Sequence, residues 1–322
     1  MVDVTDLITR CAAHGWVLTP QGHGYELTGN GQPAFFRDAE SVRVWLSKQK
    51  APESKRPTPY YGSGGITLYH GDCLEIMPHL ATGMFDAVIT DEPYGTTNCP
   101  WDAVIPLDPM WSQLKRLTKP KGTIILFGSQ PFTSVLVTSN LDMFGYEIIW
   151  DKKLSTGYLD ANRKPLKRHE NIVLFYEGRN VYNPVMRKGI ARTKGGMKAP
   201  SPIYSKSNST QKIKDDNYYP TSILEIGNTE RAGLHPTQKP LALMEYLIKT
   251  YTNEGDLILD FTCGSGTTLR AAKNLKRRAV GIEQDRQYCE VTVKRLEPAF
   301  EQALVDDGAS LDHLPLFAME DV

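Results

Sequence analysis

The chain has 322 residues, 40% of them hydrophobic and 23% charged, and its 37 basic side chains balance its 37 acidic ones. This composition is ordinary for a soluble globular protein, and the balanced charge gives no overall argument for a nucleic-acid partner. Five scattered cysteines without a C-x-x-C pair, no bilayer-length apolar stretch and no signal-peptide pattern argue against a disulfide framework, a zinc site, a membrane protein and a secreted one. We therefore expect a cytoplasmic protein without a metal.

The first 50 residues have the pattern of a small N-terminal appendage. Helices are expected over residues 4–13 and 39–50, with a hairpin over residues 15–27 between them. Residues 51–65 are rich in proline and glycine, which is typical of a linker. No chemistry is recognisable in the appendage, which is interpreted as a packing unit, with a nucleic-acid or partner contact as the alternative.

Apolar strand-like runs alternate with helical patterns from residue 66 to about residue 300. This alternation predicts an α/β fold: a Rossmann-like, doubly wound, mostly parallel sheet with helices on both faces. Residues 301–322 form an acidic tail. The expected strands are 66–69, 85–90, 122–127, 146–150, 171–176, 256–261 and 278–283, and the expected helices are 74–80, 109–117, one from about 131, 241–251, 267–275 and 285–296.

The alternation lapses over residues 178–234, which read as a long irregular insert. Between Arg179 and Arg231 the insert carries ten basic side chains against four acidic ones. Such an excess favours a phosphate-binding surface, although a solvated polar loop has the same composition. A second basic stretch lies over residues 152–168 and is open to the same two interpretations.

One candidate site follows the strand that ends at Asp260. Two glycines of the following turn would let a ligand approach the backbone outside the carboxyl end of the sheet. A dinucleotide fingerprint needs a third glycine where the chain has Leu269, and no G-K-[ST] is present. The next strand ends at Glu283, whose carboxylate can accept hydrogen bonds from both ribose hydroxyls. The candidate ligand-binding residues of the turn are Asp260, Phe261, Gly264, Ser265, Gly266 and Thr267.

A second candidate site follows the strand expected at residues 85–90 and reads Asp91-Glu92-Pro93-Tyr94. The Asp91 carboxylate and the main-chain carbonyl of residue 92 can accept the protons of an exocyclic amine while Tyr94 stacks on the ring. Taken alone, the tetrapeptide is also compatible with a simple turn. A base inside a duplex could reach such a pocket only if it were flipped out of the stack.

These segments, in this order, resemble the β-class DNA amino-methyltransferases, which use S-adenosylmethionine and carry a catalytic D-P-P-Y motif before the cofactor motif. The resemblance covers roughly residues 66–296. It includes G-D-C-L at residues 71–74, W-D at residues 101–102 and H-P-T-Q-K-P at residues 235–240. It implies that Asp72 and Cys73 contact the cofactor's adenine and that His235 and Lys239 lie near its methionine carboxylate.

The resemblance implies a sequence-specific enzyme that methylates adenine N6 in double-stranded DNA, with residues 178–234 as the target-recognition region. Asp at position 91 favours adenine, and an N4-cytosine enzyme is the first alternative. A DNA-binding protein of the same fold with weakened catalysis is the second, and a nicotinamide-dependent oxidoreductase is disfavoured by the missing glycine. A homodimer is expected by analogy, and the sequence does not decide whether a restriction enzyme is also a partner.

The chain departs from the family pattern in two places. Glu92 stands where the family has proline, and Phe261-Thr262 replace Pro-Phe in the cofactor motif. Any residue supplies the main-chain carbonyl needed at position 92, but the fixed φ of proline is lost. Glu92 is expected to point to solvent or to pair with a basic residue, and the alternative is that it weakens or alters catalysis. Phe261 is expected to pack on the cofactor's adenine.

Overall fold

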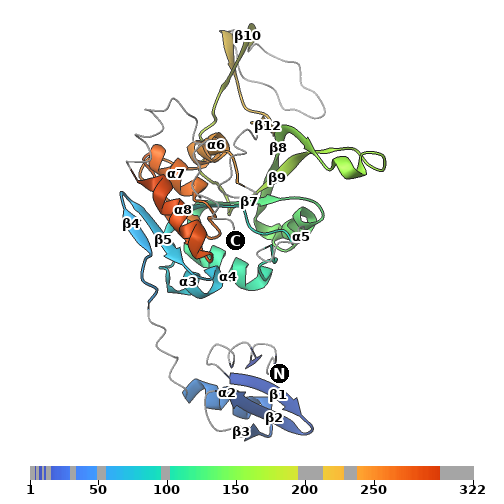
Figure 1. The fold of residues 1–322 in the computed structure, drawn as a ribbon, viewed down its shortest axis with the longest axis vertical. Coiled ribbons are helices and arrows are strands. Elements are labelled where there is room, and N and C mark those ends of the chain that lie inside the picture. Colours follow the sequence, from blue (N-terminus) through green and yellow to red (C-terminus); the bar gives the residue numbers. More distant parts are fainter. Residues whose placement is uncertain are drawn as a thin grey trace, which may run out of the picture. The chain divides into compact units, whose positions relative to one another are not determined.

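The structure, a computed structural model, describes residues 16–29, 34–48, 56–95, 102–194, 213–227 and 238–297, together with four residues before position 16. It divides into two compact units, Met1–Arg56 and Pro57–Val322 (Figure 1). Within the described ranges, no helix is both long and apolar enough to cross a membrane. The acidic tail predicted over residues 301–322 lies outside these ranges.

The N-terminal unit contains a small antiparallel sheet packed against a helix. The strands are β1 (Trp16–Gln21), β2 (Gly24–Gly29) and β3 (Ala34–Phe36), in that order, and the helix is α2 (Ala39–Lys48). Leu18 and Leu27 of the sheet are buried with Val42 and Leu46 of the helix. The predicted hairpin is present, β3 was not predicted, and most of the helix predicted over residues 4–13 lies outside the described residues.

Nine strands of the described part of the second unit form one sheet, in the order β12-β8-β9-β7-β6-β13-β14-β5-β4. Its centre, from β7 to β5, is parallel, whereas β9, β8 and β4 bring in antiparallel pairings. The strands are β4 (Tyr61–Ser63), β5 (Ile66–His70), β6 (Phe85–Thr90), β7 (Thr118–Gly128), β8 (Phe144–Thr156), β9 (Lys167–Phe175), β12 (Ile223–Glu225), β13 (Leu257–Asp260) and β14 (Arg278–Glu283).

Helices cover both faces of this sheet, because the central strands are apolar on both sides (Figure 1). In β6, Ala87 and Ile89 face one apolar cluster and Val88 faces the other. One face carries α3 (Cys73–Ile76), α4 (Leu107–Leu117) and α5 (Phe132–Thr138), and the other carries α6 (Leu241–Tyr251), α7 (Thr267–Asn274) and α8 (Arg286–Leu296). The described part of the unit also includes the short 3₁₀ helices η1 (Met77–His79), η2 (Leu141–Met143) and η3 (Tyr158–Asp160). The predicted doubly wound α/β fold is confirmed.

The structure differs from the sequence prediction in two segments. Where a linker is predicted, residues 61–63 form β4, because Gly64 and Gly65 adopt φ values of +58° and +81° and close a tight hairpin onto β5. Where an irregular insert is predicted, β10 (Arg187–Lys194) pairs with β11 (Ile213–Tyr218) in an antiparallel ribbon, and β12 joins the main sheet. The ribbon shows no apolar period because much of it is exposed to solvent.

The turn between β13 and α7 depends on a glycine. Gly266 has φ +75°, and a Cβ at this position would lie 2.5 Å from Cγ2 of the buried Thr292 on α8. Gly83 has a similar φ of +61°, but its Cβ would meet nothing within 4 Å. Alanine substitutions at these two glycines therefore separate the cost of backbone strain from the cost of a steric clash.

We expect Gly83→Ala to lower the free energy of unfolding by roughly 1 kcal/mol, from φ strain alone. Gly266→Ala should lower it by roughly 2–4 kcal/mol, because the methyl group also collides with α8. Urea unfolding monitored by circular dichroism measures both values. Equal losses in the two variants would show that the contact with Thr292 is not tight.

Candidate active site

A cavity of about 1090 Å³ lies at the carboxyl ends of four parallel strands. The residues that follow β5, β6, β13 and β14 all contribute to its wall, as expected for a ligand site in an open α/β sheet. One half is built around the glycine turn and Glu283, and we call it the cofactor half. The other half is built around Asp91 and Tyr94, and we call it the base half.

Two carboxylates border the cofactor half. Asp72 caps the N-terminus of α3 and accepts a hydrogen bond from the Leu74 amide at 2.6 Å. Glu283 accepts the Gly264 amide with one oxygen and the Asp285 amide with the other, both at 2.8 Å. An ionised carboxylate has about four acceptor positions, so Glu283 can hold the turn and still receive a ligand. Burial raises the pKa of the neighbouring Cys73 thiol to about 12, so this cysteine remains a neutral wall residue.

Asp260 and Phe261 shape the cofactor half from within. The Asp260 carboxylate accepts the Thr90 hydroxyl at 2.9 Å and the Thr262 amide at 3.3 Å. Burial raises its pKa to about 7 despite these hydrogen bonds. Phe261 is 1% exposed and belongs to the apolar cluster under α3 and α4. Both residues line the cavity, and Asp260 supports the glycine turn by accepting the Thr262 amide.

The glycine turn is fastened by side chains from distant segments. Arg295 of α8 is 1% exposed and donates to the Ser265 carbonyl at 2.7 Å, the Ser265 hydroxyl at 3.0 Å and the Thr267 hydroxyl at 3.2 Å. The Ser265 hydroxyl donates in turn to Gln238 at 3.0 Å. Sequence reasoning misses Arg295, because an arginine in an amphipathic helix gives no sign that it points inward.

Asp91 is the centre of the base half. Its Oδ1 accepts the Tyr94 hydroxyl at 2.6 Å, and its Oδ2 pairs with the ammonium of Lys239. The Tyr94 ring stacks on Phe132, with centroids 5.5 Å apart and an interplanar angle of 25°. Burial raises the pKa of Asp91, and the charge of Lys239 limits the rise. The structure thus brings an acid, an aromatic ring and a cation together at the end of β6.

Glu170 of β9 adds a second acid that sequence reasoning misses. Its Oε1 accepts Lys152 at 2.9 Å, and its Oε2 lies 3.5 Å from the Lys239 ammonium. Burial disfavours the charged forms of both Glu170 and Lys239. Lys239 and Lys152 nevertheless lower the pKa of Glu170, while Asp91 and Glu170 raise that of Lys239. The only sequence signal is a glutamate that precedes an apolar strand, and such a residue is usually solvent-exposed.

Two main-chain contacts hold residues 91–95 in place. The Thr262 hydroxyl donates to the Asp91 carbonyl at 3.2 Å and so ties the two halves of the cavity together. Asp102 accepts the Gly95 amide at 2.9 Å. Trp101 and His235 lie outside the described residues. Lys239 lies in the base half, against Asp91 and Glu170, and its predicted role toward a cofactor stays a prediction.

The expectation that Glu92 points to solvent or pairs with a basic residue is wrong. Glu92 is 3% exposed and lines the cavity, and neither carboxylate oxygen has a hydrogen-bond partner among the described residues. Its pKa is raised well above 4.5 because burial outweighs the neighbouring backbone amides, and because Asp91 repels a second negative charge. Burial therefore favours the neutral carboxylic acid over the carboxylate at Glu92.

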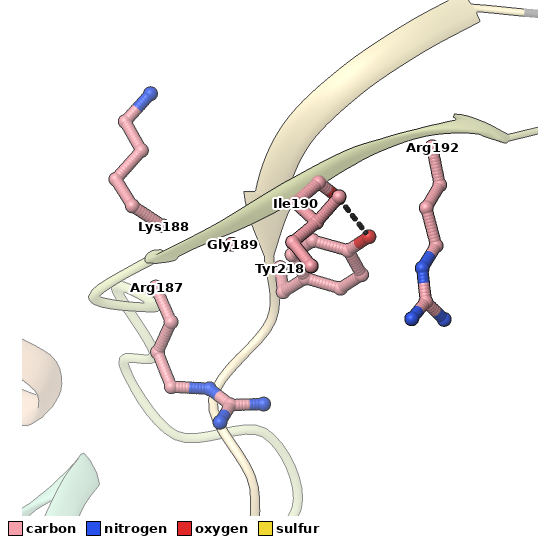
Figure 2. Close-up of a pocket in the computed structure, with 6 residues that line it drawn as sticks. All are labelled: Arg187, Lys188, Gly189, Ile190, Arg192 and Tyr218. Atoms are coloured by element: carbon pink, nitrogen blue, oxygen red, sulfur yellow. Dashed lines mark hydrogen bonds between the residues drawn. The ribbon is translucent and has the colours of Figure 1, made fainter.

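Basic and aromatic side chains gather on the exposed ribbon of β10 and β11. Figure 2 shows Arg187, Lys188 and Arg192 projecting from β10 beside Tyr218 of β11. The Tyr218 hydroxyl donates to the Ile190 carbonyl at 2.8 Å and braces the ribbon. The Ile190 side chain is 79% exposed. The ribbon thus presents positive charge to solvent together with the apolar side chain of Ile190.

Comparison with known proteins identifies the family. A profile described as DNA methylase matches residues 85–294. The Type II methyltransferase M.HpaI of Haemophilus parainfluenzae is 28% identical over 243 residues, covering 72% of this chain and 74% of the relative. M2.DpnII of Streptococcus pneumoniae is 28% identical over 273 residues, covering 74% and 92%. The solved PvuII DNA methyltransferase (cytosine-N4-specific) shares the fold, with a TM-score of 0.58 at 16% identity, over 78% of this chain and 93% of that one.

The chain belongs to the DNA methylase family, because the profile spans more than half of its residues. It is a DNA methyltransferase that takes its methyl group from S-adenosyl-L-methionine. The resemblance seen in the sequence is thereby confirmed at the level of the family, which includes both N6-adenine and N4-cytosine enzymes.

The buried Glu92 makes stability depend on pH. Its folded-state pKa is raised, so its contribution to stability is full below about pH 4.5 and is lost as the pH rises toward the folded value. We expect Glu92→Gln to become progressively more stable than the wild type above that pH, by up to roughly 1.4 kcal/mol per pH unit. Urea unfolding between pH 5 and 8 measures the difference.

Glu225→Gln is the matched control, since this side chain is 61% exposed. Its unfolding free energy should stay parallel to that of the wild type over the same range. A Glu92→Gln difference that did not change with pH would mean that Glu92 is ionised in the folded protein.

Proposed function

We propose that this methyltransferase acts on the N6 amine of an adenine flipped out of double-stranded DNA, at a specific sequence. The observation that carries the proposal is the buried Asp91 beside Tyr94 at the end of β6, in the wall of a cavity large enough for a cofactor and a base together. An N4-cytosine enzyme is the alternative, because the same acceptors suit both amines.

The cofactor half suits S-adenosylmethionine by the chemistry of its wall. Glu283 keeps acceptor positions for ribose hydroxyls, and the glycine turn lets a ligand approach the backbone. By family resemblance, Asp72 and Cys73 would contact the adenine, and His235 and Lys239 the methionine carboxylate. When bound, the cofactor supplies an electrophilic methyl group carried by a sulfonium.

The base half positions the amine and receives its charge. The Asp91 carboxylate and the carbonyl of Glu92 would accept the two amine protons, which leaves the nitrogen lone pair free to face the methyl donor. As the nitrogen gains a methyl group it becomes positive and gives up one proton. A carboxylate at this position stabilises that charge and is placed to take the proton. Tyr94 supplies the face on which the base stacks.

The insert supplies the surface for DNA. A two-stranded ribbon has the dimensions to enter the major groove, where arginine and lysine contact guanine edges and phosphates. The Arg187, Lys188 and Arg192 side chains of β10 provide such groups. The ribbon is therefore assigned to target recognition within residues 178–234.

Expression in a methylation-deficient host, followed by mass spectrometry of nucleosides and mapping of modified sites, tests the substrate. We expect N6-methyladenine within one sequence context. Asp91→Asn should lower methyl incorporation by about 10²–10³-fold, because an amide cannot stabilise the developing charge. The exposed Asp142→Asn serves as the control and should leave incorporation unchanged.

Two outcomes would change this assignment. N4-methylcytosine as the sole product would establish the alternative substrate. Retained DNA binding without methyl incorporation would indicate a catalytically weakened binding protein, and activity gained by Glu92→Pro would then identify Glu92 as the cause.

A further inference from the structure

Each carboxylate oxygen of Asp91 already has one donor in this structure. Its Oδ1 accepts the Tyr94 hydroxyl and its Oδ2 pairs with Lys239. Each oxygen keeps one further acceptor position, but a donor already bound, above all a charged one, makes the carboxylate a weaker acceptor for an amine. Asp91 therefore becomes a better acceptor for the target amine once one of these two contacts opens. Which contact opens depends on where the released donor can go, because a buried ammonium or hydroxyl left without a partner is costly.

A second acceptor, Glu170, lies near the Lys239 ammonium, whereas the Tyr94 ring is held in place by stacking. Glu170 Oε2 is buried, makes no hydrogen bond to a described residue, and lies 3.5 Å from the Lys239 ammonium. A hydrogen bond between such charges normally measures about 2.7–2.9 Å, so a displacement of under about 1 Å would form it. The Tyr94 ring is stacked on Phe132.

The surroundings of Lys239 keep it charged while it moves. Its side chain is 8% exposed, and the rings of Phe127 and Tyr94 lie 5.0 Å and 5.9 Å from the ammonium. Glu170 is itself held by Lys152, at 2.9 Å from its other oxygen. Positive and negative groups thus alternate from Lys152 through Glu170 and Lys239 to Asp91, across segments that the fold brings together.

We propose that Glu170 is a positioning residue of the methyl-transfer site, which takes the Lys239 ammonium from Asp91 when Asp91 accepts the amine of the flipped base. Glu170 touches neither the base nor the methyl donor in this scheme. It acts by providing an acceptor for the Lys239 ammonium when that ammonium leaves Asp91. The inference rests on the proposed role of Asp91 toward an amine, and it holds for adenine and cytosine alike.

The first test measures amine-dependent DNA affinity and needs no turnover. The probe is a duplex carrying the site selected by binding from random-sequence DNA, with S-adenosylhomocysteine present. In a second duplex, purine replaces the target adenine, or 2-pyrimidinone replaces a target cytosine. We expect the wild type to lose about tenfold in affinity when the amine is removed, equivalent to about 1.4 kcal/mol. Removal of the amine should weaken DNA binding by the Glu170→Gln variant less than threefold, because the Lys239 ammonium stays on Asp91 in that variant.

The second test is a double-mutant cycle with Lys239→Gln, read out as kcat and as affinity for S-adenosylhomocysteine without DNA. Glu170→Gln alone should lower kcat at least tenfold and leave that affinity within threefold. In the Lys239→Gln background it should have no further effect, because the group to be moved is gone. Glu147→Gln on the adjacent strand β8, an exposed site outside the cavity wall, is the matched control.

Several results would overturn the proposal. Equal amine dependence in Glu170→Gln and the wild type would do so, as would equal losses of kcat with and without the Lys239 substitution. If Glu170→Gln does not fold, Glu170→Asp replaces it, since its carboxylate is withdrawn by about 1.5 Å and should show the same losses in weaker form. A wild type that binds DNA in an amine-dependent manner but does not methylate it would refute the proposed function and leave the Glu170 test intact.

Discussion

Charge buried at the carboxyl edge of the sheet is the constraint on which this site depends. Asp91, Glu170 and Lys239 all lie mostly out of solvent, where an unpaired charge is unstable. Each group is tolerated only because its partners lie within a few ångströms, and those partners come from segments far apart in the chain. The base half is therefore preorganised by electrostatics as much as by packing, and a change in any member alters the others.

The two halves of the cavity are also mechanically joined. The Thr90 hydroxyl donates to Asp260 and accepts the Phe261 amide at 3.0 Å, so β6 and β13 share one polar contact at their ends. The Thr262 hydroxyl donates to the Asp91 carbonyl. The Ser265 hydroxyl donates to Gln238, the residue that precedes Lys239. A methyl donor and an acceptor amine held by these segments would keep a fixed relation, which is what a direct transfer requires.

Glu92 is the feature that distinguishes this chain from the D-P-P-Y pattern. The family proline at this position limits the backbone and has no polar side chain. Glutamate adds a buried acid whose pKa is raised by burial, so its contribution to stability falls as the pH rises. Either residue supplies the main-chain carbonyl that is proposed to accept an amine proton, so the difference concerns stability and the local field more than that acceptor.

The sequence by itself determined the layered α/β fold and the positions of Asp91 and Glu283 at strand ends. Both follow from local patterns: apolar runs define β6 and β14, and the next polar residue falls at the edge where parallel strands present ligands. The ribbon of β10 and β11 escaped prediction because an exposed ribbon has no apolar period to read.

Only the tertiary structure decided the partners of those residues. Glu170 meets Lys239 and Arg295 meets the Ser265 turn through contacts between segments far apart in the chain, and the Glu92 carboxylate has no hydrogen-bond partner among the residues that the structure describes. Whether a charged side chain is buried, and beside what, depends on how distant strands and helices pack. The local spacing of residues in the sequence does not determine that packing.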